Sequence, residues 1–330
     1  MITKVLCATI NYDHPQRGML HAMQGIFGDG HVADFDYCQL AKNGGNPSAF
    51  FVSYCDEFKP DWIWLQLQDT SIISSESILE VRKHLPKTVI THWTGDVRPE
   101  VSPYLSSICK STHLTLVSGV GLISRFKEAG AERVEYMQIG VDFEEDVIGL
   151  PAWTPPFNVP QVVLVANNYG PRFPGTRERE DAVKALMDEF IDVGIVGKGW
   201  NETWPVVGVC GVKQQYHVWK RALVCLNVNN FNNIERYYSD RQLIAMASGT
   251  PVVCHYVPGL EEEFSLGDHC VAYGDTNELV RQVEFLLNDE SRRKDIGRAG
   301  RAEVIKNHTW FSRFLSILPE VEKIRLSLLG

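Results

Sequence analysis

The sequence lacks the features that mark several large classes of protein. Its 330 residues contain no run of about 18 apolar residues, which a membrane-spanning helix needs, and the apolar stretch at residues 1–6 is too short for a signal peptide. The eight cysteines are scattered singly, without a Cys-x-x-Cys pair, so they indicate neither a zinc site nor a disulfide framework. We therefore expect a cytoplasmic protein with reduced cysteines.

Positive charge is also scarce. The chain has 32 Lys and Arg residues against 41 Asp and Glu, a net charge of −9, which argues against a protein that coats nucleic acid non-specifically. Seven basic residues nevertheless fall in one third of the chain, so positive charge can concentrate on one site. They are Arg172, Arg177, Arg179, Lys198, Arg221, Arg236 and Arg241.

What the sequence does contain is an ordinary globular composition on a length that suits two domains, with 44% apolar and 22% charged residues. Short apolar runs alternate with amphipathic stretches, which predicts repeated strand–helix units and two doubly wound α/β domains. A proline-rich segment near residues 151–156 interrupts the pattern. We expect domains at residues 1–150 and 151–309, and a final helix at 310–330 that packs back on the first domain.

Strands are predicted where the apolar runs are densest, and helices where the amphipathic stretches follow them. The predicted strands are residues 5–10, 62–67, 88–93, 114–118, 161–166, 193–197, 223–228 and 251–255. The predicted helices are residues 19–27, 119–129, 178–190, 214–222, 240–248, 277–287, 291–306 and 310–329.

Three polar side chains follow predicted strands of the first domain. His14, Asp69 and Asp96 each come just after a strand, and the carboxyl ends of parallel strands face the ligand crevice. Each of them has a plainer interpretation beside the catalytic one. His14 suits a turn before Pro15, Asp69 suits a helix cap, and Asp96 suits an Asx turn paired with Arg98.

The strongest signal is the run at residues 237–264. Ser239 or Asp240 is a suitable N-cap for a helix, whose free backbone N–H groups and positive dipole end would favour a diphosphate. Arg236 and Arg241 flank this helix start, where a cation is unfavourable unless an anionic ligand is present.

This run is similar to the C-terminal domain of group 1 glycosyltransferases. The similarity lies in Ala247-Ser248-Gly249-Thr250-Pro251-Val252-Val253, in Pro258-Gly259-Leu260-Glu261-Glu262-Glu263-Phe264, in a further strand that ends near Asp275, and in the tail Asn307-His308-Thr309-Trp310. It extends over residues 162–318 and most resembles the spore-maturation-protein subgroup, which occurs in bacteria and their phages. The resemblance implies a GT-B fold with two Rossmann-like domains. It also implies a nucleoside-diphosphate sugar as co-substrate, and among these a UDP-sugar is the preferred expectation.

The resemblance also assigns donor-binding roles by position. The loop with Asn168 and Tyr169 would meet sugar or phosphate, and either Arg177 or Arg179 matches an arginine of the subgroup. Further positions follow the family pattern: Lys198 beside the diphosphate, Gly211 and Val212 at the nucleobase, Arg236, Tyr238, Ser239 and Arg241 at the phosphates, and Glu262 near the ribose.

One departure from the family concerns two glutamates. Many members carry glutamate at the positions of Arg236 and Ile244, so Glu235 or Glu262 would have to supply the missing carboxylates. The resemblance implies no metal ion, because arginines and a helix N-terminus can neutralise a leaving diphosphate. We assign that role to Lys198, Arg236 and Arg241.

The sequence thus predicts an enzyme that moves a sugar from a nucleotide-sugar to an acceptor hydroxyl. Asp96, His14 and Asp69 are the candidate catalytic residues, with Asp96 preferred as general base over the other two. A hydroxymethylated DNA base, a glycan, a protein and a small molecule all stay open as acceptors. Two other interpretations stay open as well: a nucleotide-sugar epimerase of the same fold, and an inactive module that binds sugar nucleotides.

Overall fold

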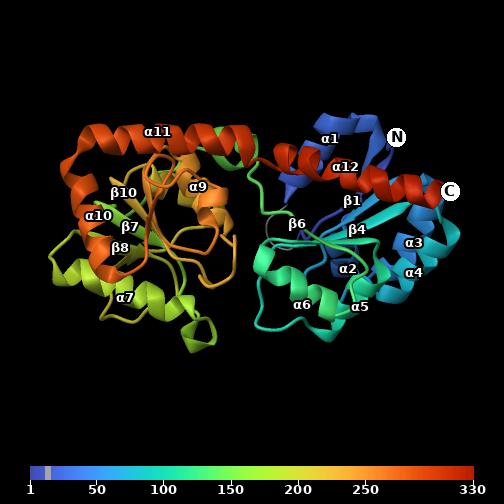
Figure 1. Cartoon of the computed structure of the whole chain (residues 1–330), viewed down its shortest axis with the longest axis horizontal. Helices are drawn as coiled ribbons and strands as arrows, with labels where there is room; N and C mark the ends of the chain where they lie inside the picture. The colour runs from blue at the N-terminus through green and yellow to red at the C-terminus, as the bar shows by residue number, and fades with distance from the viewer. Residues whose placement is uncertain (12–15) are drawn as a thin grey trace. The chain divides into compact units, whose positions relative to one another are not determined.

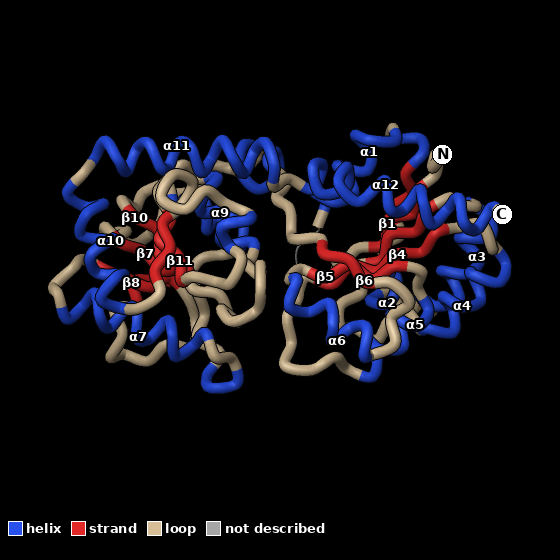
Figure 2. Tube along the Cα trace, in the orientation of Figure 1, coloured by secondary structure: helices blue, strands red, loops and turns tan. Residues whose placement is uncertain are grey.

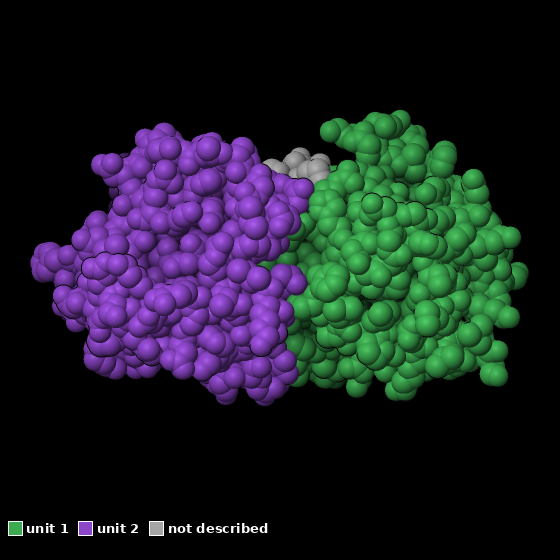
Figure 3. Space-filling model, turned by 90° about the horizontal axis from the view of Figure 1, so that it is seen from above, with its two compact units in different colours: residues 1–142, 310–330 green, residues 143–309 purple. Residues whose placement is uncertain are grey.

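The computed structural model describes residues 1–11 and 16–330 of the chain. The chain divides into two compact units, which Figure 3 colours separately. Unit 1 consists of residues 1–142 and 310–330, and unit 2 of residues 143–309. No helix of the described residues has both the length and the apolar character needed to cross a membrane.

Unit 1 is built on a six-stranded parallel sheet (Figure 1). The strand order is β2-β1-β3-β4-β5-β6, with β1 (Val5–Ala8), β2 (Val32–Asp34), β3 (Trp62–Leu65), β4 (Val89–Thr94), β5 (Leu114–Val117) and β6 (Val134–Tyr136). Its helices are α1 (Arg17–Phe27), α2 (Tyr37–Lys42), α3 (Pro47–Phe58), α4 (Ser75–His84), α5 (Pro103–Ser111), α6 (Ile123–Glu128) and α12 (Trp310–Leu329).

Helices cover both faces of this sheet (Figure 2), which explains why its strands are apolar along their whole length. In β3, Trp62 and Trp64 pack with α1 and α12, whereas Ile63 and Leu65 pack with the helices of the other face. Phe314 of α12 lies edge-on to Trp64, with 4.8 Å between ring centroids. Residues 310–330 therefore complete the hydrophobic core on one face of unit 1.

Unit 2 has a second six-stranded parallel sheet, in the order β12-β11-β10-β7-β8-β9. Its strands are β7 (Val162–Val165), β8 (Val193–Val196), β9 (Val206–Gly208), β10 (Val224–Asn227), β11 (Val252–His255) and β12 (Val271–Tyr273). Its helices are α7 (Gly175–Asp188), α8 (Gln215–Trp219), α9 (Asp240–Ala247), α10 (Thr276–Asn288) and α11 (Glu290–Asn307). The chain order reverses between the neighbours β7 and β10, and ligands of such sheets bind beyond the strand ends at this point.

The predicted fold class, an α/β protein with two doubly wound parallel sheets, is confirmed. The eight predicted strands are all present, and the observed bounds of each differ from the predicted ones by only a few residues. The free cysteines also agree with the prediction, because all eight are unpaired and seven of them are buried. Strands β2, β6 and β9 and helices α2 to α5 are additional elements that the sequence interpretation did not identify.

Candidate active site

The centre of the candidate site in unit 2 is a buried arginine, Arg179 on α7. Its side chain reaches the ends of the two central strands: Nη1 donates to the Asn167 carbonyl after β7 at 2.9 Å, and Nε donates to the Val228 carbonyl after β10 at 3.0 Å. Nη2 donates to Asn230 Oδ1 at 2.7 Å. Arg179 is completely buried. It therefore ties together the two loops that border the switch point.

No carboxylate forms an ion pair with Arg179 in the part of the chain that the structure describes, although the charge of Glu178 favours the protonated guanidinium. All three of its hydrogen-bond acceptors are uncharged, and within residues 1–11 and 16–330 no ion pair involves Arg179 or Arg241. Burial, together with the nearby positive charge of Arg241, lowers the pKa of Arg179 to about 9. An anion bound here would therefore stabilise the charged form of Arg179.

Helix α9 begins beside these arginines. Ser239 is its N-cap, but the Ser239 hydroxyl makes no capping hydrogen bond, and its oxygen is buried without a partner in the described part of the chain. The Ser239 N–H donates to Asn229 Oδ1 at 3.0 Å, and the Arg241 N–H to Asp240 Oδ1 at 2.9 Å. The expected start of the helix is correct, but the capping that we expected from the Ser239 hydroxyl is absent.

Asn168 and Lys198 come together at the neighbouring strand ends. The Asn168 N–H donates to the Lys198 carbonyl, and the Lys198 N–H donates to Asn167 Oδ1, each at 2.8 Å. The Asn168 side chain bonds Glu180, whereas the Lys198 side chain is exposed. The backbone of this region is thus fixed, and the Lys198 ammonium group faces solvent.

The remaining donor candidates of this half differ in their surroundings. Tyr169 is 48% exposed, and its ring lies 5.5 Å from that of Phe173. The side chain of Arg177 is 87% exposed and pairs only with Asp181, at 3.8 Å. Gly211 and Val212 follow β9 at the edge of the sheet, and both are exposed. Of the two arginines that the resemblance left open, Arg179 lies at the switch point and Arg177 points to solvent.

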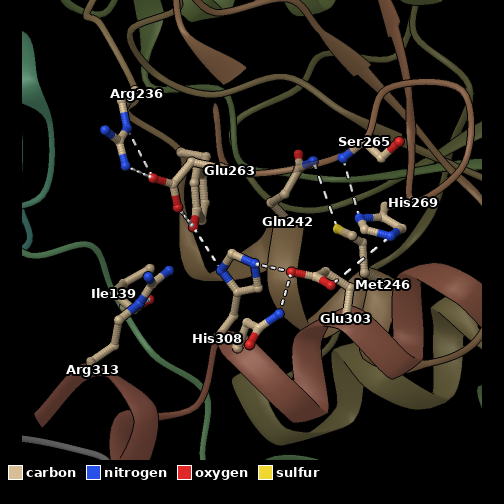
Figure 4. A network of polar contacts seen from close by, with 12 residues as sticks. Ile139, Arg236, Gln242, Met246, Glu263, Ser265, His269, Glu303, His308 and Arg313 are labelled. Carbon is tan, nitrogen blue, oxygen red and sulfur yellow. Dashed lines mark hydrogen bonds and ion pairs between the residues drawn. The ribbon is translucent and has the colours of Figure 1, made fainter. Parts of the chain in front are cut away.

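Arg236, Tyr238 and Glu262 belong to a separate polar network. Figure 4 shows its members Arg236, Glu263 and His308. The Arg236 guanidinium binds Glu263 through Nε at 2.9 Å and also through Nη2, and Glu262 through Nη1 at 3.0 Å. Tyr238 is only 1% exposed, and its hydroxyl contacts Glu263 and His308. The resemblance placed the Arg236 and Tyr238 side chains at the phosphates. In the structure, Arg236 binds two carboxylates, and the Tyr238 hydroxyl contacts Glu263 and His308.

The candidate catalytic residues of unit 1 have local partners. Asp96 Oδ2 accepts from Arg98 Nη2 at 2.9 Å, and its side chain is 51% exposed. Asp69 accepts from the Ser102 hydroxyl at 2.6 Å and caps no helix, because α4 begins later, with Ser74 as its N-cap. The helix-cap interpretation of Asp69 is therefore wrong. His14 lies outside the described residues.

Gly95, beside the candidate base Asp96, packs against its own loop. A Cβ atom there would lie 2.2 Å from the ring of Trp93. Glycine is therefore required by the packing of Trp93 against its own loop.

One Asp-x-Asp triplet, the type of carboxylate pair that can hold a divalent cation, occurs at residues 34–36. Asp34 pairs with Arg17 at 2.8 Å, and Asp36 caps α2 by accepting from the Gln39 N–H. Both carboxylates thus have structural partners. Across the described residues, no three His, Cys, Asp or Glu side chains converge as the ligands of a metal ion would.

Comparison with known proteins agrees with this geometry. Residues 177–318 match the protein family described as glycosyl transferase-like. None of the curated proteins matches the chain in sequence. The match covers the part of unit 2 that contains Arg179, α9 and the polar network, and it confirms the expectation of a glycosyltransferase enzyme.

Solved structures share the whole fold at low identity. HepE of Anabaena in complex with UDP-glucose has a TM-score of 0.63 and 12% identity, over 97% of this chain and 99% of that one. A glycosyltransferase from Rickettsia africae has a TM-score of 0.65 and 11% identity, over 98% of each chain. Sucrose-phosphate synthase from Thermosynechococcus elongatus has a TM-score of 0.58 and 14% identity, over 98% of this chain and all of that one. The chain has the GT-B fold.

Proposed function

We propose that this chain transfers a glycosyl group from a UDP-sugar to an acceptor hydroxyl, with unit 2 holding the donor and unit 1 the acceptor. The glycosyl transferase-like match, residues 177–318, lies mostly in unit 2 and ends in the first half of α12. HepE, which is similar in structure, is known in complex with UDP and with UDP-glucose. UDP is therefore the first nucleotide to test.

The observation that carries the proposal is the buried Arg179 guanidinium, which bridges the loops after β7 and β10 at the switch point of unit 2, with Arg241 in the first turn of α9. A buried cation without an ion-pair partner is costly, and a second cation close by adds to that cost. The first turn of α9 adds the positive end of a helix dipole at the same place. A diphosphate would relieve all three unfavourable terms at once.

The same groups suit the chemistry of donor cleavage. When the bond between the sugar and the diphosphate breaks, negative charge develops on the leaving oxygen, and fixed cations stabilise it without a metal ion. We assign this role to Arg241 and Lys198, with Arg179 fixing the loops. We no longer assign it to Arg236, because Glu262 and Glu263 bind that guanidinium.

Asp96 is our proposed general base. It follows β4, it is half exposed, and its partner Arg98 favours the ionised carboxylate that a base needs. Asp69 is a weaker proposal because its carboxylate already accepts the Ser102 hydroxyl. Changing Asp96 to Asn should lower the rate constant for transfer while leaving UDP affinity unchanged.

Nucleotide binding tests the proposal through a matched pair of arginines on one helix. Isothermal titration with UDP, GDP and ADP should show UDP binding to the wild-type chain. Arg179→Lys keeps the charge but loses the three-way hydrogen bonding, so we expect UDP to bind about tenfold to a hundredfold more weakly. Arg177→Lys, two residues away and exposed, should bind UDP within about twofold of wild type.

Three results would contradict or redirect the proposal. If no nucleoside diphosphate binds, or if Arg177→Lys weakens binding as much as Arg179→Lys, the donor site is misplaced. If the sugar nucleotide is converted to an isomer without any acceptor product, the chain is an epimerase. If UDP-sugar binds but is neither hydrolysed nor transferred by any preparation, the chain is a binding module, as the missing glutamates at Arg236 and Ile244 would explain.

A further inference from the structure

We infer that Glu263 and His308 are positioning residues that act through Tyr238 to hold the start of helix α9 in the geometry that binds the donor diphosphate. This inference rests on the proposed function. The three side chains contact one another and come from three separate segments: Tyr238 from the approach to α9, Glu263 from the loop after residues 260–262, and His308 from the end of α11. Figure 4 shows Glu263 and His308 within this network.

The Tyr238 hydroxyl is the centre of this arrangement. It lies 3.0 Å from Glu263 Oε2 and 3.2 Å from His308 Nδ1. The phenol ring is buried against Phe264, at 5.2 Å between centroids, and Phe264 in turn stacks on the His308 ring at 4.7 Å. Aromatic packing and two polar contacts therefore fix the residue immediately before the N-cap Ser239.

Counting protons defines how the contacts work together. An ionised carboxylate only accepts hydrogen bonds, so the single hydroxyl proton of Tyr238 goes to Glu263. The Tyr238 oxygen then accepts from His308 Nδ1–H. On the other side of the ring, His308 Nε2 lies 3.3 Å from Glu303 Oε1, an ion-pair distance without hydrogen-bond geometry. The Tyr238 hydroxyl thus serves as the donor to Glu263 and as the acceptor from His308.

The outer members of the network keep the inner carboxylates in place. Arg236 holds the other oxygen of Glu263, whose side chain is only 4% exposed. Asn307 Nδ2 donates to Glu303 Oε1 at 2.8 Å, and His269 Nε2 lies 3.9 Å from Glu303 Oε2. The polar contacts thus form one connected network, which favours a single arrangement of the buried groups.

The contacts of Tyr238 with Glu263 and His308 matter for binding because Tyr238 lies just before the N-cap and first turn of α9. Ser239 is held on its other side by Asn229, and Arg241 lies in that first turn. If the Tyr238 contacts are lost, the first turn must be ordered when the diphosphate binds, and that ordering weakens affinity. A purely structural anchor would instead lower global stability without changing the affinity of the folded protein.

The experiment compares UDP affinity among single variants of the full chain. Tyr238→Phe, Glu263→Gln and His308→Asn should each weaken UDP binding about fivefold to tenfold in isothermal titration. The double variant Tyr238→Phe/His308→Asn should be no weaker than about the worse single variant, because both act through the same contact. Hydrogen exchange at residues 239–242 should be faster in all of them.

A second tyrosine–glutamate pair supplies the control. The Tyr256 hydroxyl donates to Glu261 Oε2 at 3.0 Å, but this pair is exposed and does not contact α9. Tyr256→Phe should therefore change neither UDP affinity nor exchange at residues 239–242. It removes the same chemical group from the same pair of residue types.

The outcomes separate this inference from the proposed function. If the wild-type chain binds no nucleoside diphosphate, the proposed function fails first. If wild type binds UDP and Arg179→Lys weakens it, but folded Tyr238→Phe, Glu263→Gln and His308→Asn bind as wild type does, the positioning role is wrong and the proposed function stands. Equal weakening by Tyr256→Phe would also overturn the positioning role.

Discussion

His92 on β4 is fully buried in unit 1, and neither ring nitrogen has a hydrogen-bond partner among the described residues. Burial lowers its pKa to about 3, so the folded protein keeps this side chain neutral. An unfolded chain protonates histidine near pH 6.5. Between these two values the unfolded state binds more protons, and stability therefore falls as the pH falls.

This gives a prediction at the scale of one residue. Between pH 7 and pH 5, wild type should lose about 2 kcal/mol more unfolding free energy than His92→Leu, measured by urea unfolding at each pH. The exposed His31→Leu is the control and should follow wild type. Parallel pH profiles for wild type and His92→Leu would show that His92 is not the neutral buried group described here.

At the scale of residues, the sequence predicted which segment holds the candidate site, but it did not predict all of the residues that lie there. The run at residues 237–264 predicted a cationic helix start, and Arg241 lies there. The choice between Arg177 and Arg179 needed the helix phase: α7 begins at Gly175 and turns Arg179 inward and Arg177 outward. Glu263 and His308 were in the quoted motifs, but nothing in their spacing predicts that they meet at Tyr238.

At the scale of elements, α9 and α11 pack through a glycine. A Cβ atom on Gly297 would lie 2.0 Å from the Gly249 carbonyl oxygen, a backbone atom that cannot rotate away. Gly297→Ala should therefore destabilise unit 2 by about 2–3 kcal/mol or more in chemical unfolding. Because α9 carries the proposed phosphate site, UDP affinity should weaken as well.

Gly25 in α1 is the matched control, since a Cβ there would lie 3.5 Å from the Phe311 ring, an ordinary contact. Gly25→Ala should be neutral or stabilise the chain by about 0.5–1 kcal/mol, because alanine favours a helix interior. Equal effects of the two substitutions would mean that the α9–α11 contact is looser than the structure has it.

Elements were predictable where burial is strong and the pattern is long. The central strands are continuous apolar runs, and each was predicted. β2, β6 and β9 are three residues long, too short for a periodic signal. The starts of α3 and α5 were predictable from the sequence but were not identified. Each has a capping residue followed by a proline in the first turn, Asn46-Pro47 in α3 and Ser102-Pro103 in α5.

At the scale of the whole molecule, unit 1 depends on α12 for its core. Phe314 is completely buried against Trp64, so Phe314→Ala should destabilise unit 1 by about 3–5 kcal/mol. Phe311, one turn earlier and 45% exposed, is the control, and Phe311→Ala should cost less than about 1 kcal/mol. Hydrogen exchange in β3 and β4 measures unit 1 by itself, whereas tryptophan fluorescence would also report on Trp153, Trp200, Trp204 and Trp219 of unit 2. A small effect of Phe314→Ala would contradict this account of the core.

The two halves of the chain differ in what their sequences disclose. Unit 2 carries motifs that resemble a known family, so its donor role could be proposed from the amino-acid sequence alone. Unit 1 carries only strand ends with polar residues, because an acceptor site is shaped by loop conformation and not by a short motif. Its fold was predictable from the strand pattern, whereas its ligand was not.

The assignment of residues 310–330 to unit 1 has a consequence for how the protein is made. On the ribosome, all of unit 2 emerges before α12 does. Unit 2 can therefore fold while the tryptophan cluster of unit 1 is still uncovered on the side against which α12 packs. Unit 1 is thus the first unit to be synthesised and the last to complete its hydrophobic core. Until α12 arrives, a nascent chain carries exposed indole rings that a chaperone could recognise.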